Sequence, residues 1–199
     1  MNISHYISHK LCNYMVKNNI IDSEKIEFYL YCYDFVFDLI IFNASILIIG
    51  CILHVPVLAL LYIITITPTK MMAGGAHASS RETCSFISYF TAIMALLVIK
   101  IPVIYIPNQF LFIAFTCSII SIVILTPIDT PNRRLDVSKK SILKKYCIMY
   151  CLFLFILFIL LYFLYFKQGV FLMTICVIII AINQYIGIIT NKLSGDKAC

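Results

Sequence analysis

Six long apolar runs limit what this chain can fold into. Each is close to the ~20 residues that a helix needs to cross a hydrocarbon core of ~30 Å. The runs are Phe35–Leu53, Val55–Pro68, Phe86–Tyr105, Phe110–Leu125, Tyr146–Phe166 and Val170–Thr190. A composition of 62% hydrophobic and 12% charged residues lies outside the usual range of soluble domains. We therefore expect an all-α polytopic membrane protein with about six transmembrane helices, formed as one integral-membrane domain over residues 1–199.

The second run is short for a membrane span. It reaches the usual length only if its helix continues through Met72, and its junction with the first run, at His54-Val-Pro56, is very tight. Two structures fit this pattern: the two runs form a hairpin with a distorted turn, or the second run is a re-entrant half-helix that does not cross the membrane.

Positive charge predicts the orientation. With the N-terminus in the cytoplasm, thirteen of the fifteen Lys and Arg residues fall in cytoplasmic segments. The positive-inside rule then places both termini in the cytoplasm and requires an even number of spans. The net charge of +6 faces anionic lipid, and no basic surface is interleaved with exposed aromatic side chains, so nucleic acid is not an expected partner. The expected order is an amphipathic region (1–33), two spans (34–72), a polar segment (73–84), two spans (85–126), a basic loop (127–145), two spans (146–190) and a tail (191–199).

The N-terminal region has a helical repeat of a different kind. Ile3, Ile7, Leu11 and Met15 recur every four residues, with basic and histidine side chains between them. This pattern predicts an amphipathic helix that lies on the inner membrane face, and a frayed polar tail is the alternative. A second interfacial helix should begin near Asp22–Glu24, whose negative charges suit a helix N-terminus, and continue into the first span.

The polar segment after the second run contains His77 and Cys84. A thiolate, and an imidazole that takes and returns its proton, are the groups that a cysteine peptidase needs. On a straight helix their spacing of seven residues would separate the two side chains by ~10 Å along the axis, too far for a hydrogen bond. Gly74-Gly75 disfavours a regular helix and permits positive φ, so we expect the chain to bend there. Cys84 also lies at the expected start of the third span, where the helix dipole favours a thiolate.

The other cysteines predict neither a metal centre nor a disulfide framework. The chain has nine cysteines, an odd number, scattered mostly through apolar runs where a free cysteine behaves as a small hydrophobe. Cys147 and Cys151 share a helical face but have no CxxC partner and no nearby histidine. His77 and Cys84 alone do not complete a zinc shell, so no metal or other cofactor is expected. In a cysteine-rich chain this pair can also arise by chance, which leaves a structural role as the alternative.

Two short motifs resemble those of a known family. Gly74-Gly75-Ala-His77 followed by Cys84 is similar to the signature of the accessory gene regulator B (AgrB) family, the membrane cysteine endopeptidases of bacterial quorum sensing. The stretch from Thr126 to Asn132 is similar to the Pro-x-Asp-Thr-x-Asn segment of that family, and chain length and layout agree as well. One position departs: Lys70 stands where the family commonly has arginine, so a bidentate carboxylate contact is in doubt there.

The resemblance implies a reaction and a set of partners. Cys84 would attack the C-terminal processing site of a short amphipathic autoinducer pro-peptide (AgrD-like), with His77 as base and then acid. A thioester acyl-enzyme would follow, and an internal nucleophile of the pro-peptide would close a thiolactone or lactone. Supporting roles fall to Lys70, Gly74, Gly75, Ser80 and Arg81. The expected location is the bacterial plasma membrane, crossed several times, with the termini and the segment 73–84 on the cytoplasmic side beside anionic lipid.

Two alternatives remain open from the sequence. The first is a small membrane transporter or peptide-export component without protease activity, although the later spans are more uniformly apolar than transporters usually have. The second concerns assembly. The amides of Asn183 and Gln184 in the last span suit hydrogen bonding either between helices of one chain or across a homodimer.

Overall fold

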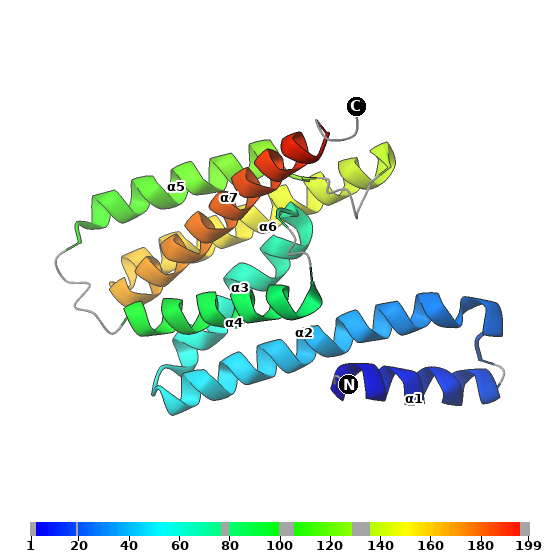
Figure 1. Ribbon diagram of the computed structural model, residues 1–199. Coiled ribbons are helices and arrows are strands. Elements are labelled where there is room, and N and C mark those ends of the chain that lie inside the picture. The colour runs from blue at the N-terminus through cyan, green and yellow to red at the C-terminus, as the bar shows by residue number, and fades with distance from the viewer. Residues whose placement is uncertain (1–2, 19, 77–79, 100–105, 129–135, 196–199) are drawn as a thin grey trace. The chain divides into compact units, whose positions relative to one another are not determined.

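The computed structural model describes residues 3–18, 20–76, 80–99, 106–128 and 136–195, and its regular elements there are all helices (Figure 1). In chain order they are α1 (Ile3–Lys17), the 3-10 helix η1 (Ser23–Lys25), α2 (Ile26–Ile52), α3 (Pro56–Ala73), α4 (Arg81–Val98), α5 (Asn108–Leu125), α6 (Val137–Phe163) and α7 (Lys167–Gly195). Within the described ranges, β-structure is limited to one isolated bridge between Gly74 and Ile128. The predicted all-α fold is confirmed.

Among the described residues, five helices are long and apolar enough to cross a membrane: α2, α3, α5, α6 and α7. The apolar part of α4, Glu82–Val98, is shorter. All six apolar runs of the sequence therefore contain a helix, and the predicted polytopic membrane architecture is confirmed. The sequence predicts a third span that begins at Phe86, but α4 begins at Arg81, because Ser80 caps it there.

The helix α3 continues beyond the end that its apolar run predicts. That run ends at Pro68, yet the helix extends to Ala73 and has the length of a span. Pro68 has no N–H to donate to the carbonyl of Ile64, and the hydroxyl of Tyr150 on α6 donates to that oxygen instead, at 2.6 Å. An uninterrupted α3 favours the full span over the re-entrant half-helix. The tight junction before α3 is also present, since His54 has a positive φ of 59°.

Two other helices extend into segments that the sequence leaves as loop and tail. α6 begins at Val137, inside the expected basic loop, and α7 continues to Gly195. The ammonium of Lys139 lies 3.5 Å from the carboxylate of Asp136, the residue just before α6. Lysines are good helix formers, and the negative charge of Asp136 suits a helix N-terminus, so the basic residues of this region can continue the helix of the span.

The chain divides into two compact units, Met1–Ile48 and Ile49–Cys199. In the first, α1 runs antiparallel to α2 (Figure 1). Nδ1 of His5 on α1 lies 2.9 Å from Oδ2 of Asp34 on α2. The predicted N-terminal helix is therefore present, and α2 is a single helix that runs from the interfacial region into the first apolar run, as the sequence predicts.

The buried face of α1 differs from the predicted apolar stripe. Ser4, Ser8 and Cys12 are buried, whereas Ile7 is 39% exposed. The buried residues lie one position along from the stripe, and the hydroxyl of Ser8 donates to the carbonyl of Ser4, which satisfies its hydrogen-bonding need. Small side chains thus occupy the inner face of α1, and Ile7 remains available to contact lipid.

In the second unit, α7 is the central helix. It packs against α3, α4, α5 and α6. The side chains that α7 buries most completely are Leu172, Met173, Cys176, Val177, Ile180 and Gln184. Most of these are apolar, as a bundle core requires, and Gln184 is the exception. This exception lies where α7 meets the C-terminal end of α3.

Candidate active site

The structure describes only part of the predicted site. Residues 73–76, here called the glycine segment (Ala73–Ala76), and residues 80–84 are described. The proposed base, His77, lies outside the described residues, as does Ser79. The side chain of Arg81 is also not described, although its backbone begins α4. The structure therefore describes the two flanks of the site, which are the glycine segment and residues 80–84.

Cys84 lies in the first turn of α4, and its side chain is half-buried. Ser80 is the residue before the helix, and its Oγ accepts a hydrogen bond from the amide of Thr83 at 3.1 Å. The amide of Cys84 donates to the carbonyl of Ser80, also at 3.1 Å. This N-cap fixes the start of the helix. The thiol of Cys84 thus lies near the positive end of a helix dipole, which stabilises an anion.

A second cysteine outside the apolar spans is less suited to nucleophilic attack. Cys12 on α1 is buried. Desolvation, and to a lesser degree the nearby carboxylate of Asp34, raises the pKa of the Cys12 thiol. A raised pKa leaves less thiolate at neutral pH, and the thiolate is the reactive form.

The glycine segment ends α3 and turns the chain sharply. Gly74 has φ 72° and Gly75 has φ 140°, both in the region that favours glycine. The bend that the sequence predicts at these two residues is therefore present. Beyond α3 the segment is extended, and Gly74 forms a parallel bridge with Ile128, whose amide donates to the carbonyl of Ala73 at 3.1 Å.

The other side of the glycine segment contacts α7 at very short range. The amide of Ala76 donates to the carbonyl of Asn183 at 3.1 Å. A Cβ on Gly187 would lie 2.8 Å from the backbone N of Ala76 and 2.8 Å from the backbone C of Gly75, closer than real Cβ contacts. A Cβ on Gly75 would in turn collide with the side chain of Asn183. Glycine is therefore required on both sides of this contact.

A buried hydrogen-bond network joins the glycine segment to three helices. Nε2 of Gln184 on α7 donates to the carbonyl of Ala73 at 3.3 Å and to Oγ1 of Thr126 at 3.1 Å. Thr126 follows α5, and its hydroxyl donates to the carbonyl of Ile122 at 2.6 Å. The thiol of Cys147 on α6 lies 3.5 Å from the same hydroxyl. The end of α3 is thus connected to α5, α6 and α7 at one place.

Lys70 lies near both flanks of the site. Its side chain is exposed, and Nζ is 3.5 Å from Oγ of Ser88 on α4. This contact links the last turn of α3 to the helix that carries Cys84. The exposed ammonium can attract a carboxylate, but it lacks the planar fork of arginine.

The chain matches the family model of accessory gene regulator B over residues 8–188. It belongs to the AgrB family. Comparison with curated proteins and with solved structures gave no match. Membership supports a role in the accessory gene regulator system of quorum sensing, for a membrane protein whose substrate is a peptide.

The two motifs that carry the AgrB resemblance are in contact in the structure. The bridge between Gly74 and Ile128 joins the glycine motif to the stretch that begins at Thr126. The rest of that stretch, residues 129–132, lies outside the described residues. The sequence indicates each motif separately, but it contains no local signal that they pair.

Sequence reasoning missed the connection of α7 to this AgrB site. It indicates that the amides of Asn183 and Gln184 hydrogen-bond between helices, which is confirmed for Gln184 within one chain. It does not connect them with the glycine segment more than 100 residues earlier, since the hydrogen bond from Gln184 to Ala73 spans 111 residues. A polar amide pair in an otherwise apolar span is the signal that could have raised the question.

Among the described residues, no group of three or more His, Cys, Asp and Glu side chains could hold a metal ion.

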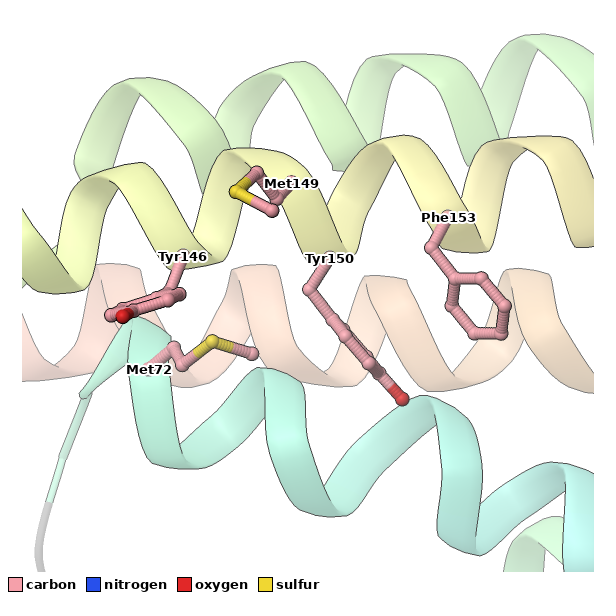
Figure 2. A pocket seen from close by; sticks show the side chains of 5 residues that line it. All are labelled: Met72, Tyr146, Met149, Tyr150 and Phe153. Carbon is pink, nitrogen blue, oxygen red and sulfur yellow. The ribbon is translucent and has the colours of Figure 1, made fainter.

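A cavity of about 340 Å³ lies between the end of α3 and α6 (Figure 2). Its lining residues are Met72, Tyr146, Met149, Tyr150 and Phe153. The lining is almost wholly apolar and suits either a lipid chain or an apolar side chain of a peptide.

Proposed function

We propose that this AgrB-family protein is a membrane-embedded cysteine endopeptidase that processes a short autoinducer pro-peptide. It would remove the C-terminal part of the pro-peptide and allow the remainder to close into a thiolactone or lactone. The observation that carries the proposal is the position of Cys84, a half-buried thiol in the first turn of a capped helix, beside the motif that the family shares. His77, which directly follows the glycine segment, is the proposed base.

The proposed reaction begins with the thiolate of Cys84, formed as His77 takes the thiol proton. The sulfur attacks the carbonyl carbon of the scissile peptide bond, and the C–N bond breaks as His77 returns the proton to the leaving amine. The product is a thioester between Cys84 and the N-terminal part of the pro-peptide. An internal cysteine of the pro-peptide gives its thiol proton to His77 and attacks this thioester, which closes the ring and releases the Cys84 thiolate. Exchange of one thioester for another is nearly neutral in energy, so exclusion of water at a membrane edge favours cyclisation over hydrolysis.

The oxyanion that forms during attack needs backbone donors near Cys84. The amides of Thr83 and Cys84 already donate to Ser80. We therefore assign this role to the amides of Arg81 and Glu82, which precede them in the first turn of α4. The ammonium of Lys70 would add a positive charge that attracts a carboxylate of the pro-peptide.

The proposed location is the bacterial plasma membrane, with both termini and the residues around Cys84 in the cytoplasm. Thirteen of fifteen basic residues support this orientation, and it requires an even number of crossings. The five long apolar helices are an odd number, so α4 would be the sixth span. Its 18 residues extend ~27 Å, close to the ~30 Å of a hydrocarbon core. Reporter fusions at each terminus would test this, and opposite sidedness of the two termini would contradict it.

The decisive experiment is co-expression with a candidate precursor, a short amphipathic peptide that contains an internal cysteine. Wild-type protein should cleave the peptide, and Cys84→Ala and His77→Ala should each abolish cleavage without lowering the protein level in the membrane. Cys117→Ala is the matched control, because Cys117 is an exposed cysteine on α5 with no part in the mechanism. Mass spectrometry of the peptide gives the cleavage site and the ring. Full processing by Cys84→Ala would refute the proposal and favour a transport or export component.

A further inference from the structure

Gln184 is a fully buried polar side chain whose presence stability alone does not explain. Its Nε2 donates to the carbonyl of Ala73 and to the hydroxyl of Thr126. Its Oε1 is buried and has no hydrogen-bond partner among the described residues. An unpaired buried carbonyl oxygen destabilises a fold, and an apolar side chain of similar size would avoid that cost.

The two acceptors of Gln184 do not depend on it. The carbonyl of Ala73 also accepts from the amide of Ile128 at 3.1 Å. The hydroxyl of Thr126 also bonds to the carbonyl of Ile122 at 2.6 Å and lies 3.5 Å from the Cys147 thiol. Removing Gln184 would therefore leave both groups with partners. What Gln184 adds is one further hydrogen bond to each of these groups, from a single side chain on α7.

Those groups bracket the glycine segment. Gln184 holds the carbonyl at its first residue, Ala73, and the carbonyl of the neighbouring Asn183 accepts from the amide at its last residue, Ala76. Two consecutive residues of α7 thus contact both ends of a segment of four residues, here called the α7 clamp (Asn183 and Gln184). The next residue in the chain after Ala76 is His77. The short approach at Gly187 allows this contact.

We propose that Gln184 is a positioning residue for the reaction: as part of the α7 clamp it fixes the glycine segment and, through it, the proposed base His77. This inference rests on the proposed protease function. Gln184 does not touch the substrate in this proposal, so its loss should lower kcat and leave KM unchanged. It should also weaken the influence of His77 on the reactivity of Cys84.

The test variant is Gln184→Met, which has a similar length and volume and no donor. We expect kcat for the co-expressed peptide precursor to fall by roughly 10-fold to 100-fold, as for other misplacements of about 1 Å, with KM unchanged. Thr174→Val is the matched control. Thr174 is another buried polar residue of α7, and its hydroxyl bonds to the carbonyl of Val170 in the same helix, so this variant should keep wild-type kcat.

A second readout needs no substrate and depends on the shape of a pH profile. The rate of Cys84 alkylation by iodoacetamide is measured against pH in membranes, with the Cys84 peptide followed by mass spectrometry. The profile of Gln184→Met should shift toward that of His77→Ala, while Thr174→Val should follow wild type. A wild-type profile in Gln184→Met would overturn the inference, and so would a raised KM at unchanged kcat.

Gln184→Asn covers the case in which Gln184→Met does not accumulate. It keeps an amide in the bundle but is one methylene shorter, so it cannot hold both hydrogen bonds, and kcat should again fall. Wild-type kcat in this variant would overturn the inference. The experiments distinguish the proposed protease function from the proposed positioning role. Absence of cleavage by the wild-type protein would refute the protease function, whereas wild-type cleavage by the Gln184 variants would refute only the positioning role of Gln184.

Discussion

Replacing Gly187 by alanine would put a methyl group into the contact between α7 and the glycine segment. A Cβ at this position would lie 2.8 Å from N of Ala76 and 2.8 Å from C of Gly75. Both are backbone atoms and cannot rotate away as a flexible side chain would. Alanine is a better helix former than glycine, so α7 itself should tolerate the change. The effect should therefore appear in the glycine segment.

The size of the effect follows from these distances. Ordinary contact of a Cβ begins at 3.4 Å, so a start at 2.8 Å requires a movement of about 0.6 Å. Overpacking of this kind typically costs ~1–3 kcal/mol. Catalytic groups need to be held within about 0.5 Å of their productive geometry, and a misplacement of about 1 Å costs roughly 100-fold in rate. We therefore expect kcat for peptide cleavage to fall by ~10-fold to 100-fold in Gly187→Ala.

The assay is cleavage of the co-expressed peptide, normalised to the protein level in the membrane. Gly169→Ala is the control on the same helix. Its Cβ would meet ring atoms of Phe166 at 2.5 and 2.7 Å, and that ring is a side chain that can move. Gly169→Ala should therefore keep near wild-type kcat. Wild-type cleavage by Gly187→Ala, or an equal loss in both variants, would refute the reasoning.

Two further predictions concern single hydrogen bonds. Ser80→Ala removes the side-chain cap of α4 and should lower the stability of the helix by ~1 kcal/mol, so the amide of Thr83 should exchange faster in hydrogen-exchange mass spectrometry. Ser80→Asp should restore protection of this amide. Unchanged exchange in Ser80→Ala would contradict the capping role. Tyr150→Phe removes the hydroxyl that donates to Ile64 and should lower thermal stability in detergent by an amount equivalent to ~1 kcal/mol. Tyr165→Phe, at a position 88% exposed, should leave stability unchanged, and equal stability of both variants would exclude a structural role for the Tyr150 bond.

Local patterns predicted the helices well but not all of their ends. The six apolar runs all contain helices because length and hydropathy are properties of a continuous stretch of chain. The apolar run that predicts α3 ends at Pro68, and the sequence left open whether the helix continues through Met72; the helix ends at Ala73. A hydroxyl from α6 removes the cost of the missing N–H at Pro68. That donor is distant in sequence, so no pattern around Pro68 could indicate it.

The sequence predicted that α1 is amphipathic, but it did not indicate which residues the helix buries against protein. A repeat of apolar residues indicates which face avoids water, and in a membrane protein that face can contact lipid instead of protein. Ser4, Ser8 and Cys12 form the buried face because small residues allow close approach. Periodicity alone does not distinguish these two apolar environments.

Local sequence patterns are sufficient to predict the class of the protein and the local form of its site. Apolar length predicts membrane helices, the glycine pair predicts the bend after α3, and the polar residues before the third span predict that Cys84 lies near a helix start. The contacts that hold the bend in place are tertiary: the strand-like contact with Ile128 and the α7 clamp of Asn183 and Gln184. Hydrogen bonds that close over as many as 111 residues depend on how helices pack, and packing depends on the whole bundle and not on any one stretch of sequence.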